Sequence, residues 1–212
     1  MASLKLVTAP TIDPVTVAEV KTYLRIDGTD DDTMLGNFIT AATKTIESFL
    51  NRKCINQTWD FWLDCFPYEV KFDSLIPDGV TEGKLSEYIS TKKFIEIPIF
   101  PLVSVTHLKT YDDDGTAYTM SSSDYIVDAN SEPPRLSLKN STTWPSTYLR
   151  PVNGIVIQFV VGYGATAAST PYPIKQAIME MCGKFYNSRG CEDSTINKAT
   201  MAILAPYRVM RI

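Results

Sequence analysis

The sequence predicts an α+β fold, a small helical bundle built from both chain ends with an inserted antiparallel β domain. Near both ends, apolar residues recur every three or four positions, as in helices with one buried face, whereas in the middle they alternate. Each terminal helix needs a partner for its apolar face, and packing the two ends together is the simplest solution. We therefore expect residues 1–54 and 172–212 to form the helical domain and residues 55–171 the β domain.

The first fifty residues contain two helix starts. Thr16 and Glu19 have the spacing of a capping box, which predicts a short helix ending near Leu24. The run Asp30–Asp32 places carboxylates at the positive end of a second helix, which we expect to run to about Asn51. One apolar stripe follows this helix: Leu35, Phe38, Ile39, Ala42, Ile46, Phe49 and Leu50.

From Gln57 the apolar period changes to two, which predicts a half-buried strand with Trp59, Phe61, Leu63 and Cys65 on its apolar face. Residues 74–93 contain Pro and Gly and are expected to form a mobile excursion. Asp112–Gly115 is typical of a hairpin turn. Residues 155–161 are nearly all apolar, as in a central strand covered on both faces. Further strands are expected at 94–97, 103–111, 118–120, 125–128 and 135–138.

The C-terminal part returns to helical spacing. After Gly162 breaks the central strand, Pro171 and Pro173 mark the start of a helix, because a first turn tolerates proline. Its stripe is Ile174, Ala177, Ile178, Met181 and Phe185. A last short helix is expected over about 194–204, with Pro206 ending it.

Composition and charge argue against several classes of function. The 212 residues have a net charge of −4 and no cluster of cations, which argues against sequence-independent DNA binding. No apolar run is long enough to span a membrane, and no signal peptide is expected at the start. None of the four cysteines (Cys54, Cys65, Cys182 and Cys191) forms a CxxC pair, which favours buried or incidental thiols in a reducing compartment.

Residues for chemistry are sparse. His107 is the only histidine and lies in phase with apolar strand residues, so we expect a structural role. Neither aspartate run has the Gly and Glu positions of a calcium loop. There is no GxSxG motif, and Gly162–Gly164 lacks the spacing of a phosphate loop. We therefore expect no catalytic residue, metal ligand or cofactor, and a protein that is not an enzyme.

Several segments occur in the order known from one protein family. The chain resembles the head–tail connector, or adaptor, proteins of long-tailed phages and related gene-transfer particles over about 190 residues. No single segment is specific, but their common order is. The segments are 14–25, 30–32 before a long helix, 57–59, 101–105, 111–115, 159–164, 173–178 and 204–208. Residues 184–189 depart from the family's usual aromatic run, and residues 74–93 look particular to this chain.

The resemblance implies a structural protein in the neck of the virion, assembled in the host cytoplasm. It implies a homo-oligomeric ring, normally of twelve subunits, beneath the portal protein. Such a ring extends the channel through which DNA passes without specific binding, and it offers a platform for the next neck or tail completion protein. No contact with a membrane is expected.

Two surfaces are candidate contact sites. The C-terminal tail has apolar residues with arginines between them, and we expect it to bind the portal through Leu204, Pro206, Tyr207, Arg208, Met210 and Arg211. The alternative is that the tail packs back on its own helical domain. Trp62 is a large aromatic on the polar face of its strand, which favours an interface.

Other functions stay open at this point. A tail-side completion or stopper protein of the same neck would have similar features. From a different class, a carbohydrate-binding β module could use Trp62, Trp144 and Tyr148 as a platform. A hydrolase is a distant alternative.

Overall fold

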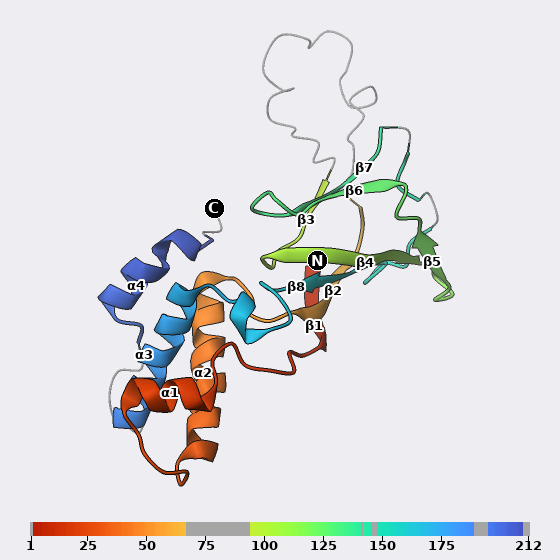
Figure 1. Ribbon diagram of the computed structural model, residues 1–212. Coiled ribbons are helices and arrows are strands. Elements are labelled where there is room, and N and C mark those ends of the chain that lie inside the picture. The colour runs from red at the N-terminus through yellow and green to blue at the C-terminus, as the bar shows by residue number, and fades with distance from the viewer. Residues whose placement is uncertain (1, 67–93, 141, 146–147, 189–194, 210–212) are drawn as a thin grey trace. The chain divides into compact units, whose positions relative to one another are not determined.

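The computed structural model describes residues 2–66, 94–140, 142–145, 148–188 and 195–209, and the predicted excursion at 74–93 lies outside them (Figure 1). The described residues form helices and antiparallel strands, which confirms the predicted α+β class. The α-helices are α1 (Val17–Leu24), α2 (Asp32–Leu50), α3 (Tyr172–Ser188) and α4 (Lys198–Leu204). The strands are β1 (Ala2–Thr8), β2 (Gln57–Leu63), β3 (Phe94–Glu96), β4 (Leu102–Tyr111), β5 (Ala117–Met120), β6 (Tyr125–Asp128), β7 (Arg135–Leu138) and β8 (Ile155–Val161).

The capping box predicted for α1 is present. The Glu19 amide donates to Thr16 Oγ1 at 3.2 Å, and the Thr16 amide donates to Glu19 Oε2 at 2.7 Å. The Thr16 amide also lowers the pKa of Glu19, because it binds the ionised carboxylate. Two donors at the helix start are thereby satisfied reciprocally, which stabilises a helix of only eight residues.

The predicted aspartates lie at the start of α2, with Asp32 in its first turn. Asp31 is the N-cap residue but makes no side-chain capping bond. Its carboxylate instead accepts a hydrogen bond from the Tyr186 hydroxyl at 2.8 Å, and Asp32 pairs with Lys21 at 2.7 Å. These aspartates therefore tie α2 to α3 and α1, which the local sequence could not indicate.

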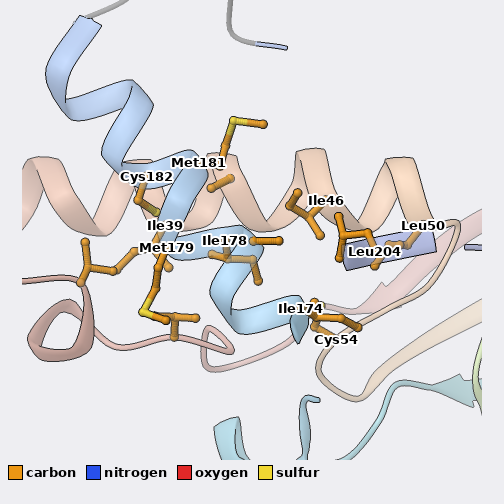
Figure 2. Close-up of a cluster of buried hydrophobic side chains, with 14 of the residues drawn as sticks. Ile39, Ile46, Leu50, Cys54, Ile174, Ile178, Met179, Met181, Cys182 and Leu204 are labelled. Atoms are coloured by element: carbon orange, nitrogen blue, oxygen red, sulfur yellow. The ribbon is translucent and has the colours of Figure 1, made fainter. Parts of the chain in front are cut away.

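The helices share one apolar core. Figure 2 shows Ile39, Ile46 and Leu50 of α2 packing with side chains of α3, and Leu204 of α4 joins the same cluster. Burying such a side chain contributes about 1.5–3 kcal/mol relative to exposure. The predicted stripes form this core, whose buried members include Leu35, Ile39, Ala42, Ile46, Leu50, Ile174, Ala177, Ile178 and Met181.

The strands form two sheets among the described residues. The five-stranded sheet has the order β1-β2-β8-β4-β5, so β8 is its central strand, as predicted. Four residues of β8 are fully buried: Ile155, Ile157, Phe159 and Val161. The three-stranded sheet has the order β3-β7-β6, and both of its pairings are antiparallel.

The predicted hairpin at Asp112–Gly115 joins β4 to β5, with Tyr111 opposite Ala117. Asp112 closes the turn, because its carboxylate accepts hydrogen bonds from the Thr116 amide at 2.7 Å and the Tyr118 hydroxyl at 3.3 Å. Gly115 has φ +81°, a conformation that favours glycine.

Three local predictions need correction. β1 was not expected. All seven of its residues are exposed, so the strand lacks the buried face that usually marks a strand of a sheet. Cys65 does not continue the apolar face of β2, because the strand ends at Leu63 and Cys65 is exposed. α4 begins only at Lys198, after Asn197 caps it. α4 ends at Leu204, as predicted, and Pro206 lies in the first turn of the 3₁₀ helix at Ala205–Tyr207 that follows.

The chain divides into two compact units. The helical unit comprises residues 6–59, 99–103 and 160–212, and the β unit comprises residues 1–5, 60–98 and 104–159. The predicted insertion of residues 55–171 as one domain stays a prediction. Of the helices in the described part of the chain, none has both the length and the apolar character to cross a lipid bilayer.

Candidate functional site

The C-terminal segment, residues 197–209, is held on the helical unit at its start by a polar network. Asn197 Oδ1 accepts the Thr200 amide at 2.7 Å and caps α4. The Thr200 hydroxyl donates to Glu180 Oε2 of α3 at 2.6 Å, and Asn197 Nδ2 donates to the same carboxylate. Since Thr200 is buried, these bonds fix both the position and the orientation of α4.

The end of this segment returns to the C-terminal end of α2. Arg52 Nε donates to the Tyr207 carbonyl at 2.6 Å, and the Val209 amide donates to the Leu50 carbonyl at 3.2 Å. The Arg208 guanidinium lies 4.7 Å from the centroid of the Phe49 ring, a cation–π contact. The chain is therefore anchored as far as Val209.

The predicted portal-binding residues that the structure describes separate into two groups. Leu204 is fully buried and Tyr207 packs against the helical core, so these two residues support the segment from within. Pro206 and Arg208 are exposed. Met210 and Arg211 lie outside the described residues. Packing back on the helical unit is thus what the segment does up to Val209, while part of it stays accessible.

The sequence reading missed the exposed apolar residues of α4. Met201 and Ile203 are 39% and 44% exposed, close in sequence to Pro206 and Arg208. We refer to the accessible residues Met201, Ile203, Pro206 and Arg208 together as the C-terminal surface; Met201 and Ile203, two positions apart in α4, lie on different faces of the helix. Apolar residues beside an accessible arginine are typical of protein contacts. The sequence did contain a signal for them: the apolar residues of α4 occur on more than one face of the helix, so they cannot all be buried.

The buried carboxylate of Glu47 holds the chain just after α2, where the C-terminal segment binds. Glu47 is 7% exposed; its Oε1 accepts the Cys54 amide at 2.8 Å, and its Oε2 pairs with Lys53 Nζ at 3.0 Å. Lys53 Nζ also lies 5.5 Å from the Trp59 ring centroid. The bonds fix residues 53–54 just after α2, next to Arg52, which binds Tyr207.

Trp62 lies in a cation–aromatic cluster of the β unit. Its ring stacks on Tyr111 with centroids 5.7 Å apart, and the Arg150 guanidinium lies 5.7 Å from Trp62 and 4.5 Å from Tyr111. Arg150 is held by Nε, which donates to the Asn153 carbonyl at 2.9 Å. Trp62 is half-buried, so it combines a packing role with an accessible edge.

The other two residues of the carbohydrate hypothesis have different surroundings. Trp144 stacks on Phe66 with centroids 4.5 Å apart and an interplanar angle of 15°. Tyr148 is 90% exposed. Trp62 and Trp144 each have one ring face covered by a neighbouring side chain, Tyr111 and Phe66 respectively.

A surface groove of about 440 Å³ lies in the helical unit between α1 and α3. Its floor includes Val15 and Met179, and its exposed residues include Tyr23 and Tyr172. The sequence reading did not identify it, because the groove depends on how two helices cross.

The described residues that could ligate a metal or react do not form a reactive site. No group of three or more His, Cys, Asp or Glu residues in the described segments could hold a metal ion. Desolvation, with Lys109 nearby, lowers the pKa of His107 and so favours the neutral imidazole. Burial raises the pKa of Cys182 to about 12, so this thiol stays protonated at neutral pH.

Comparison with solved structures gives the class of the fold. The neck of an empty gene transfer agent particle, computed with C6 symmetry, contains a chain with TM-score 0.77 and 19% identity, covering 99% of this chain and 97% of that one. A chain in the neck of a native particle with C12 symmetry has TM-score 0.73, 21% identity and coverage of 99% and 97%. At these identities the likeness shows that the fold is shared.

A family model matches the N-terminal part of the sequence. Residues 14–82 match the profile of the phage gp6-like head-tail connector proteins. The predicted resemblance to phage head–tail connectors is therefore confirmed, and the matched region includes α1, α2 and β2. Curated proteins give no match.

Proposed function

We propose that this protein is a head–tail connector that forms a ring beneath the portal of a phage-like particle. The observation that carries the proposal is the family match over residues 14–82, together with a fold shared over 99% of the chain with neck proteins of gene transfer agent particles. The ring would extend the DNA channel and present a platform to the next neck or tail protein. Because one such neck has C12 symmetry, twelve subunits is the number we propose.

The C-terminal surface is the part that would contact the portal. Leu204, Tyr207 and Val209 anchor the segment, while Met201, Ile203, Pro206 and Arg208 stay accessible. A rigid support with exposed apolar and arginine side chains lowers the entropic cost of binding. Trp62 and its neighbours Tyr111 and Arg150 would contact a further neck component from the β unit.

The test is to add the purified full chain to portal-bearing heads that lack it and to image the product by electron microscopy. We expect a rotationally symmetric ring beneath the portal and recovery of tail joining. Heads that bind no added protein, or a protein located only on the tail side of the neck, would contradict the proposal. The second outcome would favour a completion or stopper protein.

A further inference from the structure

The turn before β8 is tied to two strands of the five-stranded sheet. The Arg150 amide donates to the Tyr111 carbonyl at the end of β4 at 3.1 Å, and the Tyr111 amide donates to the Gly154 carbonyl at 2.8 Å. The Asn153 amide donates to Asp64 Oδ1 at 3.0 Å, just after β2. Because these bonds hold both ends of the turn on the strands, the backbone of Arg150 has a fixed position.

The Arg150 guanidinium has a fixed orientation as well. Its Nε donates to the Asn153 carbonyl at 2.9 Å, and its central carbon lies 4.5 Å from the ring centroid of Tyr111. The same carbon lies 5.7 Å from the ring centroid of Trp62, which stacks on Tyr111. A side chain that is ordered in advance loses less conformational entropy when it binds a partner.

The two terminal nitrogens of Arg150 have no partner in the described part of the chain. The side chain makes no ion pair there, and neither nitrogen is buried, so both face solvent. The two nearest aspartates in the chain are engaged elsewhere. Asp64 accepts a backbone amide of the turn, and Asp112 closes the hairpin between β4 and β5. Arg150 therefore presents a forked pair of donors to solvent.

Exposed apolar side chains flank this fork. Tyr148 and Val152, two positions before and after Arg150, are 90% and 65% exposed, and Trp62 adds an accessible edge. Arg, Trp and Tyr are the residue types that most often dominate the affinity of protein interfaces. The guanidinium fork matches the two oxygens of a carboxylate. The cluster thus has the chemistry to bind an acidic side chain that is surrounded by apolar residues.

We propose that Arg150 binds the carboxylate of an Asp or Glu side chain of the next neck or tail protein, while Tyr148 and Val152 contact the apolar residues around that carboxylate. This inference rests on the proposed ring and names the chemistry of the partner that its platform receives. The surrounding charge favours a protein over nucleic acid. The acidic turn Asp112–Asp114 directly follows β4 and repels a polyanion, whereas a single carboxylate pairs with the free guanidinium.

The first test replaces Arg150 and measures ring formation and tail joining separately, on portal-bearing heads that lack this protein. Arg150→Gln removes the charge, and Arg150→Lys keeps the charge but not the fork. We expect both variants to form rings. Tail joining should fall roughly tenfold or more with Arg150→Gln, and by less with Arg150→Lys. Arg135→Gln is the matched control and should join tails normally, since Arg135 also lies over a ring, that of Phe94, but already pairs with Asp128 at 2.8 Å.

The second test changes the partner. Each exposed Asp or Glu of the protein that joins next is replaced by Lys in turn. One of these changes should weaken joining to unmodified rings by roughly tenfold, and joining of that altered partner should recover on rings of Arg150→Glu, because opposite charges then meet again.

Several outcomes would overturn the inference and leave the proposed function standing. These are normal tail joining by Arg150→Gln rings, and a partner in which no acidic residue shows both the loss and the recovery. Arg150 variants that form no rings would show that the side chain serves the fold or the ring contact. Loss of DNA from the heads with unchanged tail joining would assign Arg150 to nucleic acid. Absence of rings with the unmodified chain would instead contradict the proposed function.

Discussion

At the scale of single residues, the buried thiols make a direct prediction. Cys54 and Cys182 are buried and their thiol pKa values are raised, that of Cys182 to about 12, whereas Cys65 is exposed. At pH 8, iodoacetamide should therefore modify Cys65 rapidly, and Cys54 and Cys182 only after denaturant is added. Mass spectrometry of tryptic peptides measures this, and fast native labelling of Cys182 would show that the α2–α3 core opens readily.

The same thiols predict how stability depends on pH. Because the folded state keeps protons that unfolded thiols release near pH 8.5, their contribution is complete below that pH. It should be lost as the pH rises toward the raised pKa of Cys182, about 12. Urea unfolding at pH 7 and pH 10 would measure the loss, and Cys182→Ala should reduce the difference between the two pH values.

Replacing the buried carboxylate of Glu47 should lower the free energy of unfolding strongly. Glu47→Ala leaves the Cys54 amide without its acceptor and Lys53 without its partner, so we expect a loss of about 3–5 kcal/mol in unfolding free energy. Glu47→Gln keeps an acceptor for the amide and should lose less. Denaturant titration of both variants provides the measurement. Equal losses would mean that the charge, and not the hydrogen bond to Cys54, carries the effect.

At the scale of secondary-structure elements, Gly162 determines how the end of β8 passes the chain before β2. Gly162 has φ +144°, and a Cβ there would lie 2.6 Å from the Asn56 nitrogen. Gly162→Ala should therefore destabilise the protein by about 3 kcal/mol or more, through backbone strain added to a clash with backbone atoms. Gly115→Ala is the matched control: φ is +81° but nothing lies within 4 Å, so only strain of about 1–2 kcal/mol is expected. Thermal unfolding would compare them, and similar losses would contradict the clash.

Elements were predictable from sequence where capping or burial leaves a local pattern. The capping box fixed the start of α1, and the continuous apolar run identified β8. β1 has no buried face, and the short alternation of Leu4 and Leu6 with Lys5 was the one signal for it, which the sequence analysis did not use. The sequence showed that the C-terminal tail is rich in apolar residues. It did not show which residues hold the tail in place, because Arg52 and Tyr207 lie 155 positions apart. Such a contact depends on tertiary packing, which one sequence does not display.

At the scale of the whole molecule, some residues of the C-terminal segment contribute to the stability of the fold and others are accessible for assembly. Leu204 is fully buried, so Leu204→Ala should cost about 2–5 kcal/mol of stability, and any loss of binding would follow from unfolding. Arg208 is exposed and contacts Phe49 from outside, so Arg208→Ala should cost only about 0.5–1 kcal/mol. A truncation from Tyr207 onward would mix the two effects, because it also removes the Arg52 and Leu50 contacts.

Arg208→Ala therefore gives the sharper measurement of portal docking. If the C-terminal surface binds the portal, this variant should unfold at nearly the normal temperature yet co-sediment poorly with portal-bearing heads, because each of the repeated contacts in a ring is weakened and the losses multiply. Arg135→Ala is the matched control, since Arg135 also lies over an aromatic ring, 5.2 Å from the Phe94 centroid, but in the β unit. It should co-sediment normally. Equal binding by the two variants would mean that Arg208 contributes only to packing on Phe49 and that the portal contact lies on another surface.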